Sequence, residues 1–397
     1  MMKSQNTSTI QNKDGEIIDK QTKITGQVSG AKWTEVLPYF VGTALILSMY
    51  YMQEKYNNIF FGVWIIYAVV PILDHIVPHD NYNLPEKEIR NYEKDSRFLI
   101  PLYTAWAADF LLYFWGFYLI VQDKYPTSPG LFLALTFGIA NAGALNLSIG
   151  HELVHRRELV HKILGNLVYS KMLYSHFIIQ HIKSHHKKVA TFEDPSSARK
   201  GESIWDFLFR TVPEGFVETW ELEKNRLQQE VAVYKFFGVF GVVYQIVYSI
   251  FDIIFFETIN YVEHYGLQRK LDSNGNYESI KITHSWNAPQ AVTNYFLFKL
   301  QRHSDHHAHS YKPYQILESL PESPCLPFGY SATFLMAYVP FVWFKVMDPY
   351  VDSINKNEKM SEEVETELKR WCKGLLIVIS ILVTYITFFV IGFTPNY

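Results

Sequence analysis

The sequence predicts an all-α integral membrane protein, and two observations carry that prediction. Its 397 residues are 48% apolar and 16% aromatic, and the net charge is only −3. The apolar residues gather into runs of roughly 17–24 residues, about the length that a helix needs to cross a hydrocarbon core of ~30 Å. Nine of the fifteen histidines form four groups, three of which end or adjoin an apolar run. We therefore expect a helical bundle with a histidine-rich site at one membrane surface.

Charge and cysteine content exclude several classes of function. The near-neutral charge, without a basic face, excludes nucleic-acid binding. The chain has only two cysteines, Cys325 and Cys372. It therefore has no disulfide framework and no CxxC motif for an iron–sulfur or rubredoxin-type centre. Any redox partner must be a separate protein.

The first half of the chain predicts a tail and four membrane spans. Residues 1–33 are polar and lack both apolar periodicity and the apolar region of a signal peptide, so we expect a disordered tail. A charged loop that ends at Arg97 separates the second span from the third. The four predicted spans are Val36–Met52, Ile59–Val77, Phe98–Val121 and Gly130–Gly150.

Positive charge sets the expected orientation. The two turns on one side carry only Lys55 and Lys124. The tail and the loop on the other side carry Lys3, Lys13, Lys20, Lys23, Lys32, Lys87, Arg90, Lys94 and Arg97. By the positive-inside rule the tail and this loop are cytoplasmic, and four spans return the chain to that face at His151. We expect a multi-pass protein with its N-terminus and histidine site in the cytoplasm, in the plasma membrane if the source is bacterial.

The middle of the chain is less regular. Ile163–Ile179 is apolar but contains Lys171 and His176, so we expect it to lie along the membrane face or against the bundle. Residues 181–230 are polar and predict cytosolic helix and loop. Val231–Ile259, at ~29 residues, is short for two crossings of about 20 residues each. A tight helical hairpin and one deep, tilted helix both remain open for it.

The C-terminal part adds a charged helix and a span. Phe328–Met347 is apolar and contains Pro340. Glu358–Arg370 is charged and amphipathic, and Gly374–Phe393 predicts a last span. The predicted parts of the chain are a tail (1–33), a membrane-embedded domain (34–351) and a C-terminal helix with its span (352–397).

The histidine spacing predicts a metal site. Helical positions i, i+3 and i+4 share one face, which points their rings the same way. The groups are His151 with His155; His181 with His185 and His186; His264 alone; and His303 with His306 and His307. Nine neutral imidazoles are too many for one metal and suit two metals with four or five ligands each. Imidazole binds iron, zinc, copper and nickel, so the ligand type leaves the metal open.

One group also matches a zinc signature. His151-Glu-Leu-Val-His155 has the HExxH pattern, in which Glu152 would be a general base. Zinc would need only one further ligand and would leave six clustered histidines without a role, whereas an iron pair that activates dioxygen uses all nine. Carboxylates near the groups could accept the other ring N–H, or could be ordinary solvated charges. They are Glu152, Glu193, Asp194, Glu263 and Asp305.

Several other polar and aromatic residues each allow two interpretations. Asp109 lies within the third span, where an acid is either functional or paired structurally. Trp64, Trp106 and Trp115 could end a substrate channel, or could pack helices and form an interfacial belt. The remaining histidines fit no motif and are interpreted as non-ligands: His75, His79, His161, His176, His284 and His309.

From about Val36 to Val351 the chain resembles the membrane-bound alkane monooxygenases, the non-haem di-iron alkane ω-hydroxylases. His-Glu-Leu-Val-His-Arg156 resembles the first histidine box of that family, and Gln180-His-Ile-Lys-Ser-His-His the second. Asn260-Tyr-Val-Glu-His-Tyr-Gly-Leu and Leu300-Gln-Arg-His-Ser-Asp-His-His-Ala resemble two motifs that are close to diagnostic. The family has Glu and Gly where this chain has Gln180 and Ser184, and its bacterial members are not expected to carry the last span.

The resemblance implies a fold and a reaction. The fold would be a bundle of about six transmembrane helices with a cytosolic-side metal cap, in which the nine grouped histidines bind two iron ions (Fe²⁺/Fe³⁺). The reaction would convert the terminal methyl of a linear alkane to a 1-alkanol with dioxygen and two electrons. A rubredoxin-type or ferredoxin-type donor with an NAD(P)H-dependent reductase would supply those electrons.

Alternatives stay open at this point. Fatty-acyl desaturases and lipid hydroxylases share the three histidine boxes, and a xylene-type monooxygenase would act on an aromatic methyl. A zinc membrane protease would use HExxH, and a non-catalytic scaffold would have lost its metal. The motifs around His264 and His303 favour the alkane hydroxylase.

Overall fold

A computed structural model describes residues 9–11, 17–19, 30–121, 128–220 and 230–392. In these residues the regular structure is helical apart from two short strands, which confirms the predicted all-α class. Five helical stretches are long and apolar enough to cross a membrane, and a shorter apolar stretch covers Phe60–Ile76. The five are Trp33–Tyr56, Ser96–Ile120, Pro129–His155, Gly238–His264 and Glu362–Ile391.

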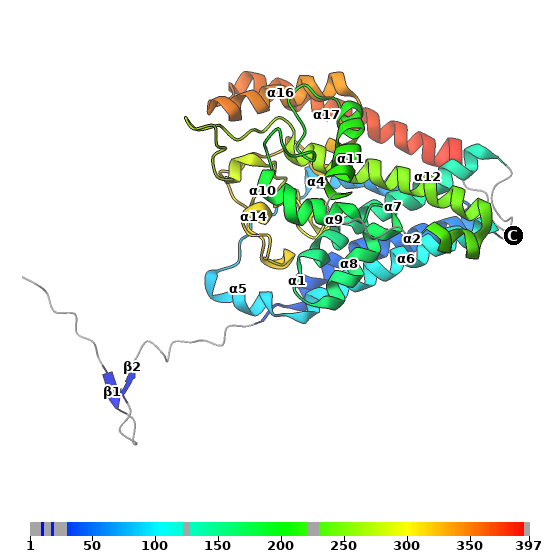
Figure 1. Ribbon diagram of the computed structural model, residues 1–397, viewed down its shortest axis with the longest axis horizontal. Helices are drawn as coiled ribbons and strands as arrows, with labels where there is room; N and C mark the ends of the chain where they lie inside the picture. Colours follow the sequence, from blue (N-terminus) through cyan, green and yellow to red (C-terminus); the bar gives the residue numbers. More distant parts are fainter. Residues whose placement is uncertain (1–8, 12–16, 20–29, 122–127, 221–229, 393–397) are drawn as a thin grey trace, which may run out of the picture.

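The long helices run side by side along the molecule, and the short histidine-bearing helices gather at one end (Figure 1). The central helices are α2 (Val41–Tyr56), α6 (Leu99–Val121), α7 (Pro129–His155) and α12 (Glu230–His264). Helix α7 packs against both α6 and α12. Gly116 on α6 has the hydroxyl of Tyr244 on α12 so near that an added Cβ would overlap it. A residue without a side chain is therefore needed there.

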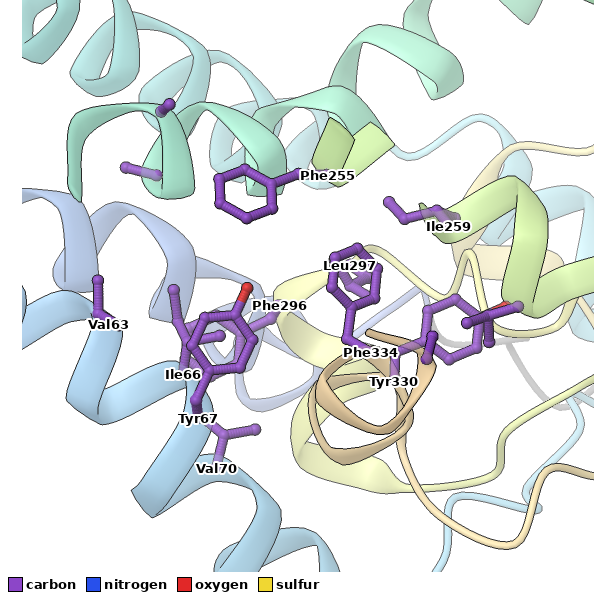
Figure 2. Packing of buried hydrophobic residues seen from close by; sticks show 14 of the residues in the cluster. Val63, Ile66, Tyr67, Val70, Phe255, Ile259, Phe296, Leu297, Tyr330 and Phe334 are labelled. Carbon is purple, nitrogen blue, oxygen red and sulfur yellow. The ribbon is translucent and has the colours of Figure 1, made fainter. Parts of the chain in front are cut away.

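The second predicted span changes its helical pitch halfway. Between α3 (Phe60–Trp64) and α4 (Val70–Ile76), one turn, η3 (Ile65–Val69), is a π-helix. Such turns are rare and occur often at functional sites. Ile66 and Tyr67 of η3 are buried in the main apolar core, together with Ile259 of α12 (Figure 2).

Short elements cover the end of the bundle where the polypeptide enters α2 and α6. They are α1 (Trp33–Val36), η2 (Leu37–Phe40), α5 (Glu86–Glu93) and η4 (Ser96–Phe98). In the N-terminal tail, β1 (Thr9–Gln11) and β2 (Ile17–Asp19) pair antiparallel, with Ile10 opposite Ile18. Residues 1–8, 12–16 and 20–29 lie outside the described residues, so the predicted disorder of the tail stays a prediction.

The apolar segment after the first histidine box folds back into the bundle. Helix α8 (Leu159–Lys171) packs along α7. At its end the ammonium of Lys171 forms an ion pair with Asp109 of α6, and neither side chain is exposed by more than 1%. The chain returns through α9 (His176–Gln180), η5 (His181–His185) and α10 (His186–Lys188). Of the two predicted locations, the burial against the bundle is therefore correct.

Helical structure with one sharp break covers the ambiguous stretch at Val231–Ile259. Helix α11 (Ile204–Trp220) precedes it, and α12 then continues to His264 with a single break in helical geometry at Gly238, where φ is 67°. The part from Gly238 to His264 is one deep helix, as the second alternative predicts, but a separate short helical piece precedes the break, so the stretch as a whole is not a single helix. Helix α12 thus delivers His264 to the histidine-bearing end.

The remaining chain forms the cap and a C-terminal arm. The cap contains η6 (Ile282–His284), α13 (Ala291–Phe296), α14 (His303–Ala308) and η7 (Tyr314–Ile316). The arm contains α15 (Tyr330–Ala337), α16 (Pro340–Lys356), α17 (Glu362–Tyr385) and η8 (Ile386–Ile391). Pro340 begins α16 because a first-turn proline loses no helical hydrogen bond, so the apolar run 328–347 is two helices.

The two predicted C-terminal segments form one continuous helix, α17. It lies against the second span, where Trp64 Nε1 donates a hydrogen bond of 3.0 Å to the hydroxyl of Thr384. The predicted domain boundary at 351 falls inside α16.

Candidate metal centre

All nine grouped histidines meet at one end of the bundle, in two adjacent groups. Within each group the candidate ligand atoms lie within 4.8 Å of one another. The group of five contains His151, His155, His181, His186 and His306. The group of four contains His185, His264, His303 and His307. The other six histidines belong to neither group of the described residues.

Local helix geometry decides which ring joins which group. His151 and His155 are four residues apart on α7, and their ring centroids lie 4.9 Å apart. In the π-helical turn η5, hydrogen bonds join residues i and i+5, so His181 lies below His186. His185 therefore points to the other group.

The last motif is divided in the same way. On α14, His303 and His307 belong to the group of four, whereas His306 reaches the group of five. The ring centroids of His186 and His307, one from each group, lie 4.9 Å apart. The segment 181–186 and helix α14 thus each supply rings to both groups.

The nitrogen atoms have the spacing of metal ligands. Nε2 of His181 lies 2.9 Å from Nε2 of His151, 3.1 Å from that of His155 and 3.1 Å from that of His186. Ligands on bonds of about 2.1 Å at 90–109° would be about 3.0–3.4 Å apart. One proton on His181 cannot satisfy three such neighbours. The rings therefore fit a metal ion at their centre.

The second group has the same geometry. Nε2 of His303 lies 3.2 Å from Nε2 of His264 and 3.0 Å from Nε2 of His307. Nε2 of His185 is buried and has no hydrogen-bond partner among the described residues. This nitrogen is thus available to a metal.

The rings outside the spans are held neutral, which is the form that binds metal. Burial, followed by the charge of neighbouring histidines, lowers the pKa of His181, His303, His306 and His307 well below the usual value. A metal would therefore displace few protons from these rings.

Two of the five predicted carboxylates contact the histidines. Asp194 Oδ2 lies 2.8 Å from Nδ1 of His185 and accepts a hydrogen bond of 2.6 Å from the hydroxyl of Ser197. Although burial raises the pKa of Asp194, the charge of His185 and these hydrogen bonds hold it below the usual value. Glu263 Oε2 lies 3.3 Å from Nε2 of His303. Both carboxylates thus contact rings of the group of four.

The other three carboxylates have different surroundings. Glu152 forms an ion pair with Arg156 at 2.8 Å, which does not suit a general base. Asp305 is buried, but it accepts from Nδ1 of His309 at 2.8 Å and from Lys312. Glu193 is exposed to solvent. All five carboxylates are close to the histidine groups along the chain. Closeness in sequence does not show in which direction a side chain points.

An apolar cavity leads toward the histidines. It has a volume of about 50 Å³ and lies between η3, α7, α12 and α15 (Figure 2). A smaller cavity touches His151, His181 and His303. Ile259 lines both cavities, so the apolar space and the space beside the rings adjoin the same side chain.

The three predicted channel tryptophans line neither cavity of the described residues. Trp64 bonds to Thr384 as described above, and Trp106 donates to the carbonyl of Leu164 at 3.1 Å. Trp115 donates to Glu54 at 2.9 Å. Each tryptophan thus links two helices, as the helix-packing interpretation predicts and the channel interpretation does not.

The sequence did not reveal two polar pairings. Tyr330 of α15 donates a hydrogen bond of 2.9 Å to Glu263 Oε1. Asp109 accepts from Asn146 at 2.6 Å in addition to its ion pair with Lys171. The charge of Lys171 inside an apolar run was a signal for the second pairing, whereas nothing near Tyr330 pointed to Glu263.

Sequence comparisons add the family. The profile of the fatty acid desaturase family matches residues 126–230 and 230–330, which contain all nine histidines. The alkane 1-monooxygenase of Ectopseudomonas oleovorans is 35% identical over 362 residues, covering 82% of this chain and 88% of the relative. That of Acinetobacter baylyi is 32% identical over 335 residues, with 78% and 82% covered. The chain belongs to the alkane 1-monooxygenase family.

Membership of the alkane 1-monooxygenase family makes this protein an oxygenase enzyme and explains the desaturase profile through the shared histidine boxes. A xylene/toluene monooxygenase hydroxylase component of Pseudomonas putida is 24% identical over 268 residues, 56% of this chain and 70% of the relative. The alkane 1-monooxygenases match more of the chain at higher identity.

Proposed function

We propose that this enzyme hydroxylates the terminal methyl group of linear alkanes to 1-alkanols, with dioxygen and two electrons from outside. The observation that carries the proposal is the apolar cavity that shares Ile259 with a smaller cavity touching His151, His181 and His303. A linear chain gains about 0.8 kcal/mol for each methylene that leaves water. An apolar cavity of this size therefore suits the end of such a chain, whose terminal methyl would lie nearest the rings.

The nine histidines are proposed as the ligands of two iron ions that cycle between Fe²⁺ and Fe³⁺. The iron pair, when bound, supplies dioxygen activation, in which one oxygen atom enters the alcohol and the other leaves as water. The rings bind through the nitrogens that converge within each group. Asp194 accepts the Nδ1 proton of His185 and so aims its Nε2 inward.

The electrons must come from another protein. The chain has only Cys325 and Cys372, and their separation excludes a CxxC iron centre. We propose a rubredoxin-type or ferredoxin-type donor with an NAD(P)H-dependent reductase as the partner. It would approach the end of the bundle where His155 and His186 are partly exposed.

The proposed orientation puts the N-terminus and the metal centre in the cytoplasm. The structure places the start of α2, the start of α6 and the histidines at the same end of the bundle (Figure 1). The tail and the 77–98 loop, which carry most of the positive charge near the first spans, join the bundle at this end.

The reaction is tested with membranes that contain the protein and a supplied electron donor. Octane, hexadecane, xylene and stearoyl thioester are offered separately, and the products are identified. We expect 1-alkanols from the two alkanes. Formation of only an unsaturated acyl product would instead establish a desaturase, and exclusive oxidation of xylene an aromatic methyl hydroxylase.

The metal is tested by elemental analysis of the purified protein. We expect two irons per chain. One zinc per chain would contradict the proposal and support the protease alternative. The ion pair of Glu152 with Arg156 already disfavours that alternative, because a general base must be free to accept a proton.

A further inference from the structure

Helix α11 (Ile204–Trp220) carries three stripes of side chains. Residues three or four apart share a face of a helix. The first stripe is buried against the protein: Ile204, Phe207, Thr211, Gly215 and Thr219. The second is apolar and exposed: Trp205, Phe209, Phe216 and Trp220. The third is charged: Asp206, Arg210, Glu214 and Glu218.

The charged stripe faces the histidine-bearing cap. Arg210 forms an ion pair of 2.7 Å with Glu202 and donates to the carbonyl oxygens of Pro195 and Ser197. Glu218 accepts from the hydroxyl of Ser184, in the second histidine box. These contacts orient α11 about its own axis.

Glu218 also forms an ion pair of 2.7 Å with Lys188 of α10. At 100° per residue, the apolar stripe lies about 120° around the helix from the charged stripe. The exposed apolar stripe is therefore turned away from the cap residues that the charged stripe contacts.

The contacts of α11 with α12 show at which position along the bundle α11 lies. Thr211 donates a hydrogen bond of 3.4 Å to Glu257, and the rings of Phe207 and Tyr261 lie 5.4 Å apart. These α12 residues are about 4–10 Å from His264 at 1.5 Å per residue. Figure 1 shows α11 crossing the direction of α12.

This crossing point lies near one end of the apolar part of α12. The apolar part of α12, Gly238–His264, has 27 residues, and its length of about 40 Å exceeds a hydrocarbon core of ~30 Å. A segment of this length places its two ends at or near the two surfaces of the core, so Glu257–Tyr261, about 4–10 Å from the end at His264, lies near one of those surfaces.

We propose that α11 is an in-plane membrane helix, whose apolar stripe inserts into the lipid leaflet on the side of the metal centre. A helix with aromatic residues on one face and charges on another is typical of the lipid–water interface, and tryptophan favours that depth. Phe209 is 83% exposed, which in water would be costly but in lipid is favourable. The helix would hold the histidines within about 10 Å of the lipid boundary.

The test places a fluorescent label at single cysteines in the full chain, reconstituted in lipid vesicles. The background carries Cys325→Ser and Cys372→Ser. Phe209→Cys labels the apolar stripe, and Glu214→Cys, whose side chain is 51% exposed, is the matched control on the charged stripe. Quenching by brominated phospholipid reports contact with lipid, and quenching by iodide reports contact with water.

We expect the Phe209 label to be quenched several-fold more by brominated lipid than by iodide, and the Glu214 label to show the reverse. Stronger quenching of the Phe209 label by iodide would overturn the proposal. Protection of that label from both quenchers would show that a protein covers the stripe, and would overturn it as well.

Folding is checked separately from lipid contact. Because the Phe209 side chain packs little against the protein, its replacement should leave the metal content unchanged. Phe216→Cys repeats the measurement at a second position of the stripe. If both labels on folded protein report water, the in-plane helix is wrong whatever the activity of the enzyme.

Discussion

The two histidine groups differ in how the protein supports them. In the group of four, His185, His264 and His303 are at most 2% exposed and only His307 is partly buried, and Asp194 and Glu263 contact two of the rings. In the group of five, His155 and His186 are only partly buried. Among the described residues, no carboxylate forms a hydrogen bond or an ion pair with a ring of that group.

The difference teaches that the two sites reach their metal by different means. In the group of four, buried Asp194 accepts from Nδ1 of His185, which orients that ring and makes it a better donor. The group of five relies on one more ring and lies nearer the solvent. We therefore expect the group of four to be the tighter site and the more sensitive to single changes.

The largest effect is expected from His264→Ala. It leaves the group of four with three rings, so we expect iron content to fall toward one per chain. Alkane turnover should fall by more than about 100-fold, since even outer-sphere changes cost 10–100-fold. Iron analysis and product formation measure the two effects.

The control for this change is His309→Ala. His309 contacts Asp305 but belongs to neither group, so two irons and most activity should remain. Full activity of the His264→Ala protein would remove His264 from the proposed ligands and break the comparison.

A smaller effect is expected from Asp194→Asn. The amide cannot accept the His185 proton as strongly, so affinity for the metal of the group of four should fall about 10–100-fold. Metal titration of the stripped protein gives the affinity. Glu193→Gln, one residue away and exposed, should change nothing. Equal losses in both variants would mean that the Asp194 contact is incidental.

Tyr330→Phe should have a still smaller effect. It removes the hydroxyl that donates to Glu263 and leaves a buried carboxylate oxygen without that partner. A loss of about 1 kcal/mol, or roughly fivefold in kcat/KM, is expected with both irons retained. Tyr338→Phe, which loses a hydrogen bond of 2.9 Å with Thr258, is the matched control and should affect turnover less.

The smallest effect concerns the rate of metal removal. A water-soluble chelator should remove iron in two phases, with the faster loss from the group of five, because His155 and His186 are partly exposed. Asp194→Asn should accelerate only the slow phase. A single phase in the unmodified protein would show that the two groups release metal together. It would contradict the proposed difference in how the protein supports the two groups.

Much of the site follows from residue type and spacing. The nine histidines stand out because three motifs repeat rings at helical intervals, and the apolar runs define spans by their length alone. Asp109 and Lys171 were visible as charges in apolar segments, although their pairing was not. Whether Val231–Ile259 formed one helix or two depended on the neighbouring helices, because both conformations satisfy its own backbone hydrogen bonds.

By itself, the sequence determined the class of the protein and its set of candidate ligands, because both depend on composition and on periodicity along one chain. Only the tertiary structure decided how the nine rings divide. A π-helical turn at η5 pairs His181 with His186 rather than His185, and α14 sends His306 to one group and His307 to the other. Helical spacing shows which residues share a face, but the direction of each face is set by packing against helices that are distant in sequence.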